Sequence, residues 1–180
     1  RCIIGPNGAG KTTLMQLITG KTRPDTGNVY LIGKDRERIS LIEKVEHEVA
    51  QLGIGRKFQR PTVFHDHSVF ENVELALGSR SVFRSLWGRT KPQQLEKIDE
   101  ILTTIGLSDR RNDRAGLLSH GQKQWLEIGM LLAQDPKLLL VDEPIAGMTH
   151  QETERTAELL KGLAGKHTVE LRDSDVRFID

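Results

Sequence analysis

Residues 3–18 read IIGPNGAGKTTLMQLI, and this stretch decides the fold. The apolar pair at its start is typical of a buried strand. A glycine-rich loop follows, and Leu14, Leu17 and Ile18 then recur at the spacing of an amphipathic helix. The order of strand, loop and helix predicts an α/β fold.

The loop itself matches a phosphate-binding pattern, because Gly5 to Thr12 fit G-x-x-x-x-G-K-[ST], the P-loop. The glycines let successive backbone N–H groups turn inward around phosphate oxygens, at the positive end of the following helix. Lys11 is expected to reach the β- and γ-phosphates of ATP, and the Thr12 hydroxyl is expected to ligate Mg²⁺. The residues expected to bind the phosphates are Asn7, Gly8, Ala9, Gly10, Lys11, Thr12 and Thr13.

A second motif carries two carboxylates. The apolar run 138–141 is typical of a buried parallel strand, and Asp142 and Glu143 follow it directly. Such a strand places both carboxylates at the carboxyl edge of the sheet, where α/β proteins bind ligands. We expect Asp142 to hold Mg²⁺ and Glu143 to polarise the attacking water as general base.

The other apolar patterns alternate between strands and helices, which predicts a parallel sheet with helices on both faces. A strand is expected at 28–32, and helices are expected at 41–52, after Ser119 and at 151–164. The middle of the chain reads mainly as helix, which predicts an inserted helical subdomain. The predicted organisation is one domain over 1–180, with a RecA-like core at 1–67 and 117–180 and the helical subdomain at 68–116.

Composition limits the function. The chain has 180 residues, 37% apolar and 28% charged, which suits one globular domain. The net charge of +1 gives no support to a nucleic-acid partner, and the single cysteine, Cys2, excludes an internal disulfide and fits a reducing cytosol.

No apolar run approaches the ~20 residues that span a bilayer, so a membrane role is expected to need another chain. Because the chain opens inside a strand without an initiator Met, we expect it to be part of a longer protein.

A third motif, Leu118-Ser119-His120-Gly121-Gln122, carries a resemblance to a known family. It resembles the signature loop of the ATP-binding cassette superfamily, usually Leu-Ser-Gly-Gly-Gln, with His120 in place of a glycine. The resemblance covers nearly the whole chain and implies a P-loop NTPase fold with ATP and Mg²⁺ as cofactors. It also implies that two cassettes pack head to tail, so that Ser119, His120, Gly121 and Gln122 of one close over the ATP of the other.

The resemblance assigns roles to two more segments. Gln59 corresponds to the Q-loop glutamine, which contacts Mg²⁺ or water and reports the nucleotide state to the membrane subunits. Residues 146–149 correspond to the D-loop, which crosses the dimer interface. The implied catalytic residues are Glu143, Lys11 and Gln59, and the implied Mg²⁺ ligands are Thr12, Gln59 and Asp142.

A finer resemblance concerns the class of transporter. Residues 59–64, 118–129 and 142–149 look like the branched-chain amino-acid class of importers, and most like its urea and short-chain amide branch. This implies an ATP-hydrolysing importer subunit for urea or for branched-chain or short-chain amino compounds. The implied partners are a second cassette in a homo- or heterodimer, transmembrane permease subunits and, indirectly, a solute-binding protein. The implied location is the cytoplasmic face of the inner membrane.

The sequence departs from the family near residue 174. The family's final strand is apolar and ends in a histidine that contacts the γ-phosphate, whereas Ser174 stands there and Glu170 and Arg172 are poor residues for a buried strand. The aromatic residue on which the family stacks adenine is expected before Arg1. Two alternatives stay open, namely a cassette that binds nucleotide with impaired hydrolysis and a soluble cassette outside transport.

Overall fold

The fold is built around a four-stranded sheet. The computed structural model of the chain describes residues 2–4, 6, 8–33, 36–57, 62–78, 92–164 and 168–173. Within this part the strand order is β1-β6-β5-β4, and every neighbouring pair is parallel. The strands are β1 (Cys2–Ile4), β4 (Ile54–Lys57), β5 (Leu138–Asp142) and β6 (Thr168–Asp173). The predicted α/β fold with a parallel sheet is confirmed.

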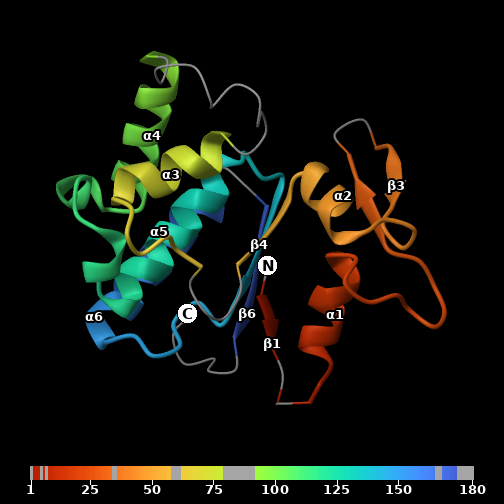
Figure 1. Cartoon of the computed structure of the whole chain (residues 1–180). Helices are drawn as coiled ribbons and strands as arrows, with labels where there is room; N and C mark the ends of the chain where they lie inside the picture. Colours follow the sequence, from red (N-terminus) through yellow and green to blue (C-terminus); the bar gives the residue numbers. More distant parts are fainter. Residues whose placement is uncertain are drawn as a thin grey trace.

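Helices cover both faces of this sheet (Figure 1). On one side lie α1 (Lys11–Ile18), α2 (Glu46–Gln51) and a small antiparallel sheet of β2 (Tyr30–Ile32) and β3 (Arg38–Ser40). On the other side lie α3 (Val69–Gly78), α4 (Pro92–Thr104), α5 (His120–Ala133) and α6 (His150–Ala164). Two 3₁₀ turns, η1 (Ser108–Arg110) and η2 (Ala115–Leu117), connect α4 to α5.

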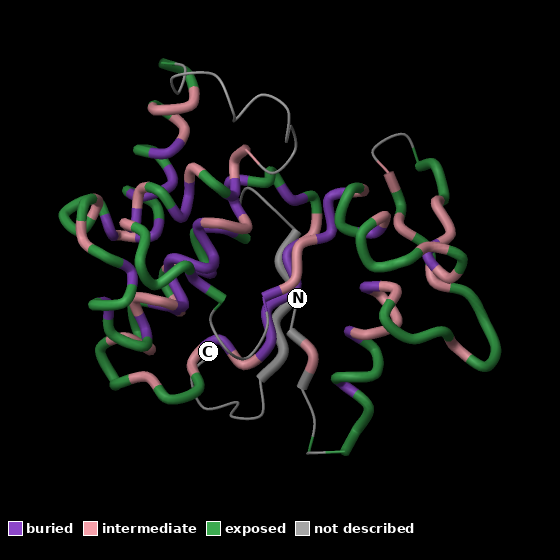
Figure 2. Tube along the Cα trace, viewed as in Figure 1, coloured by how far each residue is buried: buried purple, intermediate pink, exposed green. Residues whose placement is uncertain are grey.

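Strand β5 separates two hydrophobic clusters, because successive side chains of a strand point to opposite faces. Leu139 and Val141 join the cluster formed by α3, α4, α5 and α6, whereas Leu140 joins Met15 of α1 and Val49 of α2. Figure 2 shows buried residues along β5 and on the helices beside it. Since α3 and α4 share one cluster with α5, the helical segment packs directly on the core, and the boundaries at 67 and 117 stay a prediction.

The predicted helix over 41–52 is too long. Helix α2 begins only at Glu46, and Val45 precedes it as an exposed N-cap whose backbone N–H donates to Glu48 Oε2 at 2.9 Å. Leu41 is buried at 2% exposure, but it lies just after β3 and its N–H donates to the carbonyl of Val29. The apolar spacing that suggested one helix thus combines a residue beside the small sheet with a residue of a short helix.

The polar residues near the end of the chain do not prevent a strand. Strand β6 pairs with β1 on one side and with β5 on the other, which makes it an inner strand of the described sheet. The concern about Glu170 and Arg172 therefore did not predict the backbone correctly. Parallel pairing on both sides satisfies the backbone N–H and C=O groups of this strand, whatever its side chains are.

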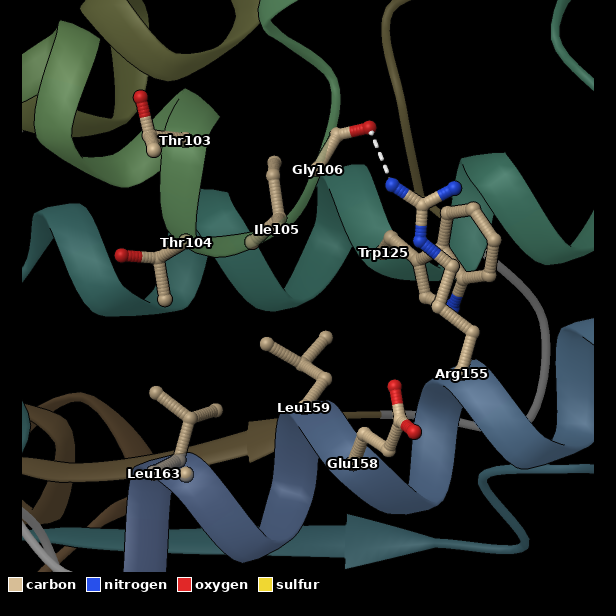
Figure 3. Close-up of a pocket in the computed structure, with 10 residues that line it drawn as sticks. Thr103, Thr104, Ile105, Gly106, Trp125, Arg155, Glu158, Leu159 and Leu163 are labelled. Atoms are coloured by element: carbon tan, nitrogen blue, oxygen red, sulfur yellow. Dashed lines mark hydrogen bonds between the residues drawn. The ribbon is translucent and has the colours of Figure 1, made fainter.

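Helices α5 and α6 are braced against each other by polar contacts within an apolar interface. The indole N–H of Trp125 donates to Thr156 Oγ1 at 2.8 Å. The Arg155 guanidinium lies 4.8 Å from the centre of the Trp125 ring and donates to the carbonyl of Gly106 at 3.0 Å (Figure 3). A hollow of about 450 Å³ lies beside these residues, between the end of α4 and α6. Trp125 therefore links α5 to α6, and Arg155 links α6 to the segment that follows α4.

Candidate nucleotide-binding site

The carboxyl ends of the parallel strands bring the candidate motifs to one edge of the sheet. Ile4 at the end of β1 pairs with Asp173, and Asp142 at the end of β5 pairs with Arg172, so these ends are nearly level across β6. Neighbouring strands lie about 4.8 Å apart. The glycine loop and the carboxylate pair therefore begin on the two sides of β6, roughly 10 Å apart, at the edge where α/β proteins bind ligands.

The glycine loop has the backbone that phosphate binding requires. Gly8 and Gly10 have φ angles of 84° and 83°, a left-handed conformation that favours glycine. Ala9 N–H donates to the Pro6 carbonyl at 3.2 Å, which closes the turn before α1. No described atom lies within 4 Å of where a Cβ would sit on either glycine, so the described residues leave space beside the N-terminus of α1, the end of a helix that attracts anions.

Lys11 and Thr12, the first residues of α1, differ in burial. Lys11 is only 5% exposed, and its ammonium donates to the Pro6 carbonyl at 2.9 Å, so this charge lies against the loop that it is expected to serve. Thr12 and Thr13 are exposed. A cation beside exposed N–H groups and a hydroxyl suits a magnesium-bound polyphosphate.

The carboxylate pair at the end of β5 consists of a buried residue, Asp142, and a residue with a strained backbone, Glu143. Asp142 is 3% exposed, and its Oδ2 lies 3.6 Å from Arg56 Nη2 on β4. Glu143 is half-buried and has a φ of 47°, which is uncommon for a residue with a side chain. Strain of this kind costs about 1–3 kcal/mol and clusters at functional sites, which supports a role for Glu143.

The structure also shows a buried ion pair that the sequence analysis missed. Lys57 at the end of β4 is fully buried, and its Nζ lies 3.7 Å from Glu127 Oε2 on α5. Glu127 Oε1 accepts the hydroxyl of Thr62 at 2.9 Å. Burial lowers the pKa of Lys57 and raises the pKa of Glu127, because desolvation disfavours both charged forms. In the sequence, Glu127 lies close to the buried residues Trp125 and Ile128 of α5. A carboxylate among the apolar residues of a buried helix is the signal that could have predicted a buried cationic partner.

The signature-like loop forms the start of α5. Ser119 caps this helix, since its hydroxyl accepts the N–H of Gln122 at 3.2 Å and its own N–H donates to Gln122 Oε1 at 3.0 Å. His120 is exposed, and its Nε2 lies 2.8 Å from Gln124 Nε2. Ser119 and Gln122 therefore form a capping box at the start of α5.

Several predicted site residues lie outside the described part of the chain, namely Asn7, Gln59 and Ser174, together with Gly5. In the described part, no group of three His, Cys, Asp or Glu residues could hold a metal ion. Mg²⁺ is commonly held by one or two protein ligands with phosphate and water oxygens, so Thr12 and Asp142 fit this cofactor.

In the same described part, no helix is both long and apolar enough to cross a membrane.

In a comparison against protein families, residues 1–146 match the ABC transporter family. The backbone of the glycine loop is consistent with this match. The chain belongs to this family. One relative of this ABC chain is the probable branched-chain amino acid transport ATP-binding protein LivG of Archaeoglobus fulgidus, which is 38% identical over 88% of the chain and 63% of the relative. Another is the phosphonates import ATP-binding protein PhnC of Wolinella succinogenes, which is 37% identical over 88% of the chain and 57% of the relative. The chain thus spans less than two thirds of either relative.

Solved structures resemble this ABC chain closely. The ADP conformation of an ATP-binding cassette of an ABC transporter has a TM-score of 0.77 and 32% identity, over 97% of this chain and 70% of that one. A dimeric post-hydrolysis state of another ATP-binding cassette, bound to ADP and Pi, has a TM-score of 0.75 and 27% identity, over 97% of this chain and 74% of that one. These similarities support the P-loop NTPase fold.

Proposed function

We propose that this protein binds Mg-ATP at the glycine loop and hydrolyses it. One observation carries the proposal: the topology brings the open glycine turn of Gly8 and Gly10 and the carboxylates of Asp142 and Glu143 to one edge of the sheet. Phosphoryl transfer needs positioning and charge stabilisation more than covalent help. A helix N-terminus with a lysine, facing a carboxylate edge, supplies both.

The candidate site residues at this edge of the sheet each have a proposed role in binding or hydrolysis. Lys11 and the N–H groups at the start of α1 bind the β- and γ-phosphates, and Glu143 accepts the proton of the attacking water. Thr12 and Asp142 would hold Mg²⁺, with Gln59 as the further proposed ligand. Mg²⁺ bound there would neutralise charge on the phosphates.

We expect Lys11→Ala to weaken ATP binding by about 10- to 100-fold, because a charge-assisted hydrogen bond contributes roughly 1.5–3 kcal/mol. Calorimetric titration of Mg-ATP into the intact protein measures this affinity. Lys21→Ala is the matched control, since Lys21 is an exposed lysine just after α1. Thermal melts of both variants report whether each is folded. ATP binding at the parent affinity in folded Lys11→Ala protein would remove the P-loop role of this lysine.

The proposed working form is a dimer of cassettes in which Ser119, His120, Gly121 and Gln122 of one face the ATP bound to the other. The similar cassette solved as a dimer with ADP and Pi supports a dimer. The exposed position of Ser119 at the start of α5 supports it too, because a helix N-terminus attracts phosphate. The second cassette is either a copy of this chain or a related chain.

The proposed cellular role is import of a small solute through transmembrane permease subunits at the cytoplasmic face of the inner membrane, with a solute-binding protein as indirect partner. The LivG relative supports a branched-chain amino acid as solute. The finer proposal is urea or a short-chain amide, and it rests on the motifs at 59–64, 118–129 and 142–149. Because a phosphonate importer is almost equally similar, solute uptake must decide. Uptake of labelled leucine and urea by the assembled transporter in vesicles is the test.

In that assembled transporter, Gln59→Ala is expected to lower solute uptake more than basal ATP hydrolysis. The reason is that Gln59 follows Lys57 at the end of β4, in the loop proposed to face the permease. Uptake and phosphate release measured on the same vesicles give the ratio. A proportional fall in both rates would assign Gln59 a catalytic role alone.

A second candidate function, nucleotide binding with slow hydrolysis, is favoured by Ser174 in the place of a histidine. Serine is shorter than histidine and cannot carry positive charge near neutral pH. Removing one preorganised donor typically lowers a rate by about 10²–10³-fold. The phosphate-release rate of the parent protein separates the two candidates.

A further inference from the structure

One carboxylate joins the signature-like loop to the start of α6. The Ser119 hydroxyl donates to Glu152 Oε1 at 2.6 Å, across 33 residues of sequence. The other oxygen, Glu152 Oε2, accepts the backbone N–H and the hydroxyl of Thr149, each at 3.0 Å. Glu152 therefore holds two loops at once, and both are proposed to lie at the dimer interface.

The packing around this carboxylate is close. A Cβ on Gly121 would lie 2.6 Å from Glu152 Cδ, so the glycine leaves the space that the carboxylate fills. The hydrogen bond from Ser119, followed by the N–H of Thr149, lowers the pKa of Glu152, so the carboxylate stays charged at neutral pH. A second link runs beside it, because Gln124 Nε2 donates to the Ala146 carbonyl at 3.4 Å.

The Ser119 hydroxyl has a single hydrogen, and this hydrogen decides what the residue can recognise. In the structure the hydrogen points to Glu152, while one lone pair accepts the N–H of Gln122. A phosphate oxygen near neutral pH is largely an acceptor, so Ser119 can bind it only after the hydrogen leaves Glu152. The negative carboxylate also repels an approaching phosphate.

We propose that Glu152 is a positioning residue that competes with the phosphate of a second cassette's ATP for the Ser119 hydroxyl. Glu152 thereby opposes closure of the nucleotide dimer. The inference rests on the proposed function, since it needs ATP bound at the glycine loop of the facing cassette. It adds a residue outside the three motifs to the control of that site.

Glu152→Gln tests the competition with little change of shape. Glutamine also serves in the capping box at the start of α6, so folding is kept. Its amide N–H₂ can donate to Ser119 Oγ, which releases the hydroxyl hydrogen for phosphate. Because charge-assisted hydrogen bonds are roughly twice as strong as neutral ones, we expect the nucleotide-dependent dimer to bind about five- to tenfold more tightly. Sedimentation of the intact protein with a magnesium-bound, non-hydrolysable ATP analogue measures this affinity.

The same substitution in a Ser119→Ala background separates a role through the hydroxyl from a general charge effect. We expect the gain from Glu152→Gln to fall to less than about twofold there. Equal gains in both backgrounds, or no gain with the hydroxyl present, would overturn the competition while the proposed function stands. If the parent does not bind the analogue at all, the proposed function fails and the competition fails with it.

Discussion

Replacing Glu143 with glutamine is expected to slow ATP hydrolysis by about 10²–10⁴-fold, the usual contribution of a positioned general base. ATP affinity should be retained, because glutamine keeps the shape and the hydrogen-bonding capacity of the side chain and loses only the basic oxygen. The structure supports this role through the place of Glu143 directly after the buried Asp142, and through its φ of 47°. Because Glu143 directly follows the inner strand β5, the strand and the strained backbone together set the position of its side chain.

Single-turnover phosphate release from the intact protein, with ATP binding measured in parallel, gives both quantities. The nucleotide-bound dimer should accumulate for Glu143→Gln on size-exclusion chromatography, because bound ATP persists. Glu100→Gln is the matched control, since Glu100 is an exposed carboxylate on α4. Hydrolysis by the Glu143 variant at the parent rate would show that another group takes the proton.

Removing one member of the buried ion pair between Lys57 and Glu127 is expected to lower the free energy of unfolding by about 3–5 kcal/mol. Glu127→Leu leaves the Lys57 ammonium desolvated and also removes the acceptor of the Thr62 hydroxyl, whereas Lys57→Met leaves the carboxylate desolvated. The double variant Lys57→Met/Glu127→Leu should be more stable than either single variant, because it buries no charge from this pair. Burial already opposes both charged forms, as the shifts in their pKa values indicate.

Urea denaturation of the four proteins gives the free energies for this comparison. The surface substitution Glu100→Leu should change stability by less than about 0.5 kcal/mol and controls for added apolar area. Additive losses, with the double variant the least stable, would mean that Lys57 and Glu127 do not act as a pair. A double variant that folds when a single variant fails to fold supports the pairing.

The P-loop could be predicted from sequence because its physics is local. Glycines at positive φ, a lysine in the first turn of a helix and a preceding strand are all encoded within about ten residues. The same holds for β5, whose continuous apolar run reports burial on both faces. These two local signals, joined by the rule that ligands bind at the carboxyl edge of a parallel sheet, were enough to predict the loop and the Asp142 edge.

Contacts between distant segments were not predictable in this way. Strand β4 contains Arg56 and Lys57, and charged residues are not typical of a buried strand. The sequence therefore does not predict this strand unless the buried partners Asp142 and Glu127 are known. The link between Ser119 and Glu152 spans 33 residues and depends on how α5 packs against α6. Conversely, the apolar spacing at 41–52 predicted a longer helix than α2, because spacing alone does not distinguish a residue at a strand end from one on a helix face.

The central claim is that the glycine loop and Lys11 bind the terminal phosphates of ATP. The most direct test is a calorimetric titration of the unmodified protein with Mg-ATP and, separately, with AMP. AMP lacks the β- and γ-phosphates and therefore loses at least two charge-assisted hydrogen bonds of roughly 1.5–3 kcal/mol each. We predict that ATP binds at least about 100-fold more tightly than AMP. Equal affinities for the two nucleotides, or no binding of ATP, would contradict the account.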